Sequence, residues 1–192
     1  MNMKKGLLII ISGPSGVGKG TVRKRIMEMD KVQLTYSISM TTRSIRPGEQ
    51  DGVDYYFVSR DEFKQRLKED NFLEHAKFVG NYYGTPRDKI DELRNQGKNI
   101  VLEIEINGAN QVMDKVKDDG VISFFIMPPN LKALEDRIRG RRSESEDVIQ
   151  ERLKKGEAEM KMTDRYDHIV LNDNIDRVSN EIIEILQNKL NQ

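Results

Sequence analysis

The chain has 192 residues, and its 32 basic side chains balance its 32 acidic ones. This length predicts a single domain, residues 1–192, with a substantial core and no space for a second interaction domain. The balanced charge gives no argument for binding to nucleic acid or to a membrane. The absence of cysteine excludes disulfides and thiol chemistry, and no run approaches the roughly 20 apolar residues that span a bilayer.

The first predicted element is a buried strand at Leu7–Ile11, and a glycine-rich loop follows it directly. Residues 13–19 read GPSGVGK, which matches the phosphate-binding P-loop pattern G-x-x-x-x-G-K. A helical pattern at Val22–Met29 comes next, as a P-loop requires. The glycines let backbone N–H groups turn toward an anion, the helix N-terminus adds partial positive charge, and Lys19 adds a full one. The loop therefore predicts a nucleoside triphosphate site.

The loop departs from the usual pattern directly after its lysine. A serine or threonine hydroxyl normally stands there and reaches Mg²⁺, but this chain has Gly20, with Thr21 one residue later. We therefore expect Mg²⁺ to be held mainly by ATP oxygens and water.

Residues 37–86 interrupt the pattern of strands and helices. They are rich in Tyr, Thr, Ser and Gly, with an alternating stretch at Tyr55–Val58 and a helical pattern at Asp61–Lys68. This composition predicts an inserted small sheet with one helix. Arg43 and Arg46 are flanked by hydroxyl residues, and forked guanidinium groups suit phosphate. A second phosphate site indicates a second, phosphorylated substrate.

The rest of the chain alternates between apolar and helical patterns. Strands are predicted at Ile100–Ile106, Val121–Met127 and His168–Leu171. Helices are predicted at Arg87–Asn95, Gly108–Lys117, Leu131–Arg139, Asp147–Met162 and Ile175–Leu190. The alternation predicts an α/β fold with a parallel sheet flanked by helices, and ligands beyond the carboxyl ends of its strands.

Arginines gather in residues 137–156, where two interpretations stay open. Arginines on a helical lid could close over the phosphates, exclude water and stabilise charge during phosphoryl transfer. The same residues could instead form an exposed helix with ion pairs four residues apart.

Taken together, these motifs resemble the bacterial guanylate kinases of the P-loop nucleoside monophosphate kinase family over essentially the whole chain. The matching segments are Gly13–Gly20, Ser39–Arg43 with Arg46, Gly48-Glu49, Gly52–Tyr55, Phe72–Glu74, Gly80–Thr85, Leu102–Glu105 with Gly108, Pro128-Pro129, Arg137–Arg141 with Ser143-Glu144, Arg152 and Val170–Asp173. The resemblance implies transfer of the ATP γ-phosphoryl group to GMP, with dGMP as a second acceptor and with Mg²⁺, giving ADP and GDP. It also implies a nucleotide-binding core (1–36, 87–136 and 157–192), a β-rich GMP-binding insert (37–86) and a helical lid (137–156).

The resemblance assigns roles to individual residues. For ATP these are Gly13, Pro14, Ser15, Gly16, Val17, Gly18, Lys19, Gly20, Thr21 and Asn172. For GMP they are Ser39, Arg43, Arg46, Tyr55, Glu74, Tyr83, Gly84, Thr85 and Glu105. The catalytic set is Lys19, Arg43, Arg137, Arg141 and Arg152. Ser39, Glu74 and Thr85 would read guanine, whose N1–H and N2–H₂ donors suit a carboxylate.

The chain departs from the family pattern at two further places. Gly140-Arg141-Arg142 replaces the usual Gly-Arg-Gly turn of the lid. Glu103 and Glu105 stand where members often carry Asp, and the period of a strand would put both on one face, within reach of water bound to Mg²⁺.

Other functions fit the motifs of this sequence less well. A non-catalytic guanylate-kinase-like module that binds phosphopeptides typically lacks the intact P-loop and lid arginines. Glu74 with Ser39 favours guanine over other bases, and no Asn-Lys-x-Asp stretch of a switch GTPase is present. We expect a cytoplasmic enzyme, a monomer or small homo-oligomer, because nucleoside triphosphates are found in the cytoplasm.

Overall fold

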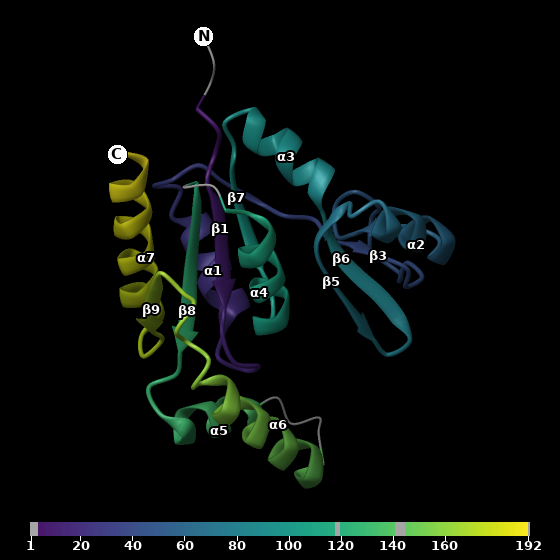
Figure 1. Ribbon diagram of the computed structural model, residues 1–192. Coiled ribbons are helices and arrows are strands. Elements are labelled where there is room, and N and C mark those ends of the chain that lie inside the picture. The colour runs from purple at the N-terminus through teal and green to yellow at the C-terminus, as the bar shows by residue number, and fades with distance from the viewer. Residues whose placement is uncertain (1–3, 118–119, 141–144, 192) are drawn as a thin grey trace. The chain divides into compact units, whose positions relative to one another are not determined.

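The computed structural model describes residues 4–117, 120–140 and 145–191. Within these ranges, five strands form a parallel sheet. They are β1 (Leu8–Ser12), β2 (Leu34–Tyr36), β7 (Asn99–Glu103), β8 (Val121–Met127) and β9 (His168–Leu171), in the order β2-β7-β1-β8-β9 (Figure 1). The expected α/β fold with a parallel sheet flanked by helices is therefore confirmed.

The described chain divides into two compact units. The first comprises residues up to Leu8, Thr35–Leu102 and Asn107–Val121. The second comprises Ile9–Leu34, Glu103–Ile106 and the described residues from Ile122 onward. The division into core, insert and lid that the sequence suggests uses other boundaries and stays a prediction.

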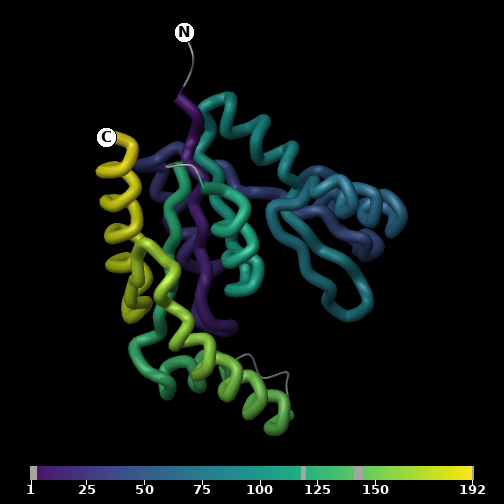
Figure 2. The backbone as a smooth tube through the Cα atoms, in the orientation of Figure 1, coloured from purple at the N-terminus to yellow at the C-terminus, as the bar shows by residue number. Residues whose placement is uncertain are grey.

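The second unit carries the P-loop and four helices of the described chain: α1 (Lys19–Glu28), α5 (Leu131–Arg139), α6 (Glu146–Glu159) and α7 (Ile175–Leu190). The strand β1 is wholly buried, because it is apolar on both faces as a central parallel strand must be. Helices α1 and α7 pack against each other, and α5 packs against α6. Figure 2 follows the backbone through both pairs.

The first unit contains a second sheet. Its strands are β3 (Met40–Thr41), β4 (Tyr56–Phe57), β5 (Phe72–Phe78) and β6 (Asn81–Pro86), in the order β4-β3-β6-β5. Helix α2 (Arg60–Lys68) covers it, and the buried rings of Phe63 and Phe72 stack with centroids 4.3 Å apart. The sequence predicted a small sheet with one helix here, and the structure has one. Helices α3 (Arg87–Asn95) and α4 (Ile106–Lys115) follow.

The structure corrects one predicted strand. Residues 100–106 were expected to be extended, but β7 ends at Glu103 and α4 already begins at Ile106. The last sheet-like bond is from the Ile104 N–H to the Ile11 carbonyl, 3.2 Å, after which the chain turns into the helix. The expectation that Glu103 and Glu105 share one strand face is therefore wrong. None of the helices in the described part of the chain is long and apolar enough to cross a membrane.

Candidate nucleotide-binding sites

The loop after β1 folds as a P-loop. Gly13 has a φ of 143°, and a Cβ there would lie 2.4 Å from the Ile126 carbonyl oxygen, so only glycine fits. Helix α1 begins at Lys19, so the loop leads straight into a helix N-terminus. The Lys19 ammonium folds back and donates to the carbonyls of Gly13 (2.7 Å) and Pro14 (3.1 Å). The predicted strand–loop–helix context is thus present, and it forms an anion-binding cradle.

Lys19 lies in an acidic setting. Burial lowers the pKa of its ammonium, while the nearby carboxylates of Glu103, Glu105 and Glu159 act in the opposite direction. The carboxylates thus offset part of the cost of burying the charged ammonium, which is the state that attracts phosphate.

Arg137 and Asn172 both donate hydrogen bonds to the P-loop backbone at Val17. Arg137 donates to the carbonyls of Val17 (2.8 Å) and Asn172 (2.6 Å), and the Asn172 amide donates to the same Val17 carbonyl at 2.8 Å. Both line a hollow of about 360 Å³ with Gly16, Val17, Gly18, Thr21, Asp173 and Ile175. The structure thus brings together residues predicted for ATP from three distant parts of the chain.

Helix α6 contributes two further side chains to the P-loop. Arg152 donates to the Ser15 hydroxyl at 3.1 Å. Glu159, a residue that sequence reasoning missed, is buried and accepts the Ser15 N–H at 3.2 Å. It also pairs with Lys155 at 3.5 Å. The signal available was helical spacing, because residues 152, 155 and 159 share one face of a helix.

The space left by Gly20 is taken by a carboxylate. A Cβ at Gly20 would lie 3.2 Å from Oε1 of Glu103, whose Oε2 accepts a 2.9 Å bond from Arg23. Glu103 and Glu105 line a hollow of about 370 Å³ together with Lys19, Gly20 and Thr21. The Glu105 side chain is 73% exposed, and its ammonium partner is Lys155, 3.8 Å away. The carboxylates predicted to lie near the metal therefore border the P-loop.

Carboxylate oxygens suit Mg²⁺, which is usually bound through one or two carboxylates and phosphate oxygens. The residues beside Gly20 thus fit an ATP-bound Mg²⁺. No group of three or more His, Cys, Asp or Glu side chains arranged to hold a metal by itself occurs among the described residues.

In the first unit, one predicted phosphate site is assembled around Arg43. Its guanidinium donates to both carboxylate oxygens of Glu49, at 3.0 and 2.7 Å, and lies 5.4 Å from the ring centroid of Tyr55. The Tyr83 ring lies 6.2 Å from the ring of Tyr55, which places it on the same side of the guanidinium. Arg46 is exposed, and its backbone N–H donates to Glu49 at 2.8 Å. The pairing with Arg43 lowers the Glu49 pKa from 4.5 to about 2.

Two of the predicted guanine-reading residues, Glu74 and Thr85, face each other across two strands, and the third, Ser39, directly precedes β3. Glu74 pairs with Thr85 between β5 and β6, and the Thr85 hydroxyl donates to the Glu74 carboxylate at 2.7 Å. The register of β3 with β6, continued by one residue, brings Ser39 beside Thr85. Glu74 and Thr85 are buried. Gly84 leaves room for Phe72, because a Cβ there would lie 2.8 Å from that ring.

Some predicted residues are not tested by this geometry. Arg141, with Arg142, Ser143 and Glu144 of the lid turn, lies outside the described residues. Glu105 belongs to the second unit, so its predicted contact with guanine stays a prediction.

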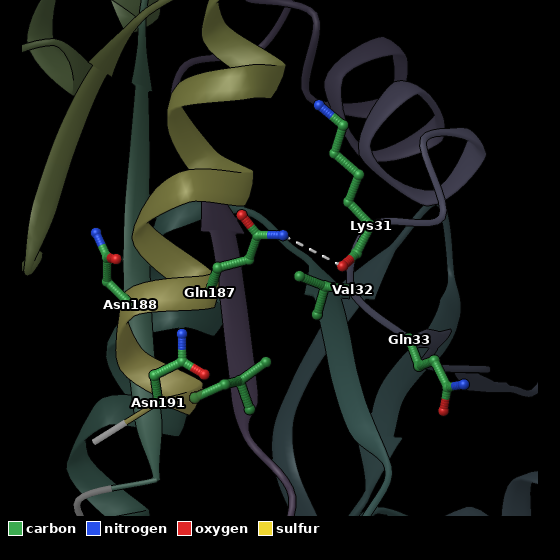
Figure 3. A pocket seen from close by; sticks show the side chains of 7 residues that line it. Lys31, Val32, Gln33, Gln187, Asn188 and Asn191 are labelled. Carbon is green, nitrogen blue, oxygen red and sulfur yellow. Dashed lines mark hydrogen bonds between the residues drawn. The ribbon is translucent and has the colours of Figure 1, made fainter.

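A further hollow of about 570 Å³ lies elsewhere in the second unit. It is lined by Lys31, Val32, Gln33, Gln187, Asn188, Leu190 and Asn191, and the Gln187 amide donates to the Lys31 carbonyl at 3.4 Å (Figure 3). None of the residues that the sequence singled out lines it.

Comparisons with known proteins give the family of the chain. The guanylate kinase family model matches residues 5–189. A guanylate kinase from Mesoplasma florum is 48% identical over 182 residues, which is 95% of this chain but 61% of that protein. The chain thus spans less than two thirds of the length of this curated relative.

One solved structure gives the same family, and a second shares the fold. The crystal structure of a guanylate kinase from Anaplasma phagocytophilum matches with a TM-score of 0.72 and 32% identity, covering 98% of this chain and 88% of that one. An uncharacterised protein from Eubacterium ventriosum, 14% identical with a TM-score of 0.54, covers 96% of this chain and 99% of its own, and shares the fold. With a family model that covers nearly all of it and a solved relative matched along most of its length, the chain belongs to the guanylate kinase family.

Proposed function

We propose that this protein transfers the γ-phosphoryl group of ATP to GMP, and to dGMP, giving ADP and GDP for guanine nucleotide synthesis and salvage. Membership of the guanylate kinase family supports this activity. In the reaction, a phosphate oxygen of GMP forms a bond to the γ-phosphorus while the bond from that phosphorus to the β–γ bridging oxygen breaks.

The observation that carries the choice of acceptor is the buried carboxylate of Glu74, to which the Thr85 hydroxyl donates. Guanine offers N1–H and N2–H₂ as adjacent donors, and an ionised carboxylate accepts both. Adenine has an acceptor at N1, so a carboxylate there would face a lone pair and stay unpaired. Discrimination by a buried polar group of this kind is strong, because the wrong base leaves it without a partner.

The phosphate of GMP would be held by Arg43, Arg46, Tyr55 and Tyr83. The Arg43 guanidinium is oriented by Glu49 and by the Tyr55 ring, so its remaining donors are directed before the ligand arrives. Preorganised donors cost little ordering entropy on binding.

On the donor side, Lys19, Arg137 and Arg152 would surround the phosphates of ATP, with Arg141 as a fourth cation and Asn172 near the adenine. Fixed cations aimed at the phosphoryl group stabilise the charge that spreads over its oxygens in the transition state. Mg²⁺ bound with ATP would neutralise part of this charge. ATP oxygens and water would be its main ligands, and Glu103 and Glu105 would contact that water.

Residues 137–156 would act as a lid that excludes water, because an open site would hydrolyse ATP. Since ATP is abundant in the cytoplasm, we propose that the protein works there. We expect a monomer or a small homo-oligomer.

A coupled assay of ADP release with GMP, dGMP, AMP, UMP and CMP tests the activity. We expect turnover with GMP and dGMP, and a preference for GMP over AMP of at least about 100-fold, because a buried unpaired group costs several kcal/mol. Equal rates with all five nucleotides would contradict guanylate kinase activity.

The substitution Glu74→Gln tests whether Glu74 recognises guanine. The variant replaces one acceptor oxygen by a donor, so kcat/KM for GMP should fall by at least about tenfold. The KM for ATP should stay within twofold, because the P-loop is unaltered. Unchanged GMP turnover would remove Glu74 from the site. Absence of all turnover in the wild-type protein, together with binding of phosphopeptides, would favour the non-catalytic module instead.

A further inference from the structure

The strand that carries Glu74 lies at the edge of its sheet. In the order β4-β3-β6-β5, the strand β5 has a neighbour on one side only. Its pairing with β6 is also irregular between Phe72 and Glu74, where the register shifts. An edge strand presents backbone N–H and C=O groups that need partners, and a register shift weakens the ladder locally. The position of Glu74 therefore depends on what holds the outer edge of β5.

One side chain of α4 holds this edge as a neighbouring strand would. The Gln111 amide nitrogen donates to the His75 carbonyl at 3.1 Å, and its amide oxygen accepts the His75 N–H at 3.0 Å. Both backbone groups of the residue that follows Glu74 are thus satisfied by a single primary amide. Such a pair fixes the strand in position and in rotation about its axis.

A second side chain holds the strand on the other side of Glu74. Lys115 donates to the Phe72 carbonyl at 2.7 Å and pairs with Asp70 at 2.7 Å. Gln111 and Lys115 are four residues apart, so they lie on one face of α4. The backbone is therefore anchored to the same helix on both sides of Glu74.

The same helical face also meets the Glu74 carboxylate. A Cβ at Gly108 would lie 2.9 Å from its Oε2, so glycine leaves the space that the carboxylate occupies. Gly108 stands in the first turn of α4, where the helix dipole favours a negative charge. Gly108, Gln111 and Lys115 follow the i, i+3, i+7 spacing of one helical stripe.

We propose that Gln111 is a positioning residue for guanine recognition: by clamping the His75 backbone, it holds Glu74 where one carboxylate can accept both N1–H and N2–H₂ of guanine. This inference rests on the proposed function. Gln111 bonds the backbone of the strand at His75, so its proposed role is exerted through Glu74.

The test compares Gln111→Met with the wild-type protein, using GMP and IMP as acceptors. IMP has the N1–H donor but lacks the 2-amino group, so the ratio of the two kcat/KM values reports how well Glu74 is placed. Methionine keeps the length and volume of glutamine but makes neither bond. Because Glu74 is then held less firmly, we expect the KM for GMP to rise, and the preference for GMP over IMP to fall, by about tenfold. The KM for ATP should remain within twofold.

Gln65→Met is the matched control, because the Gln65 amide lies on the exposed side of α2 and donates to Glu69 of the same helix. It should leave the preference unchanged. If Gln111→Met does not fold, Gln111→Glu replaces it, because a carboxylate keeps the acceptor for the His75 N–H and loses only the donor. The folded Gln111→Met variant should show faster hydrogen exchange at the His75 amide, because it leaves this N–H without its acceptor.

The outcomes separate the two proposals. A Gln111 variant that keeps the wild-type preference for GMP over IMP within twofold overturns this inference and leaves the proposed function standing. A wild-type protein that does not discriminate between GMP and IMP overturns the role of Glu74, and this inference with it.

Discussion

At the scale of single residues, carboxylates hold two arginines of this protein in fixed orientations. Arg43 is bound by both oxygens of Glu49, and Arg139 by both oxygens of Glu146. Each of these acids has its pKa lowered from 4.5 to about 2, because the guanidinium stabilises its ionised form. These pairs orient long, flexible side chains that would otherwise lose entropy on binding.

The Glu49 pair predicts a specific dependence of stability on pH. Because its native-state pKa lies below the unfolded value, acid favours the unfolded chain, which binds the proton more readily. The stabilisation is complete above pH 4.5 and is lost as the pH falls toward about 2. Urea unfolding across this window should show a falling free energy of unfolding, and Glu49→Gln should fall less steeply.

Some of the slope should persist in that variant, since Glu146 titrates over the same range. Direct titration of the Glu49 carboxyl group by NMR provides the independent check. A midpoint near 4.5 in the folded protein would show that the pair with Arg43 does not form in solution.

At Gly20, a missing side chain is matched by a neighbouring carboxylate. The hydroxyl that this loop position usually supplies is absent, and the Glu103 carboxylate, supported by Arg23, lies against the empty space. From the sequence, Gly20 is a departure from a motif. In the structure, the small size of Gly20 leaves room for the long side chain of Glu103.

At the scale of elements, one helix beside the P-loop, α7, is stabilised by a side-chain cap at its N-terminus. Asn174 caps α7, and its side-chain oxygen accepts the N–H groups of Asp176 and Arg177 at 3.0 and 3.1 Å. This helix packs against α1, which begins at Lys19, and its N-terminus borders the hollow that contains Asn172 and Asp173. The cap therefore contributes to stability next to the predicted adenine site.

Asn174→Ala should lower the free energy of unfolding by about 1 kcal/mol, the usual cost of losing an N-cap. Chemical denaturation measures this loss. Asn188→Ala, at an exposed position within the same helix, is the control and should be neutral or slightly stabilising, since alanine has the higher helix propensity. Equal stability of the two variants would show that the cap is not needed to hold α7.

At the scale of the whole molecule, two compact units carry different parts of the predicted machinery. The P-loop, Arg137, Arg152 and Asn172 belong to the second unit, and Arg43, Tyr55, Glu74, Tyr83 and Thr85 belong to the first. Phosphoryl transfer requires both substrates to meet with water excluded, so we expect the GMP-binding insert (37–86) and the lid (137–156) to close towards the core when both substrates bind.

We therefore expect GMP together with a non-hydrolysable ATP analogue to reduce the radius of gyration in small-angle X-ray scattering. A compact chain of 192 residues has a value of about 16 Å, which the doubly bound state should approach. Glu74→Gln, which should bind GMP poorly, is the control and should show a smaller change. An unchanged radius with both ligands bound would argue against closure.

The features that depend on local spacing could be predicted from the sequence alone. The apolar run of β1, the glycines of the P-loop and the lysine at the helix start lie within 15 consecutive residues, 7–21, so their arrangement follows from chain geometry. The alternation of apolar and helical segments likewise predicted the parallel sheet. The edge strand β2 was missed because three residues carry too little periodicity, and β7 was drawn too long because Ile104 and Ile106 continue its apolar pattern.

The contacts between distant segments become visible only in the folded structure. Glu159 reaches Ser15 across 144 positions, Arg23 reaches Glu103 across 80, and Gln111 reaches His75 across 36. No spacing rule links such residues, because their proximity arises from the packing of α6, β7 and α4 onto other elements. A buried polar group must find a partner wherever the fold provides one, so these partners become visible only once the elements are packed.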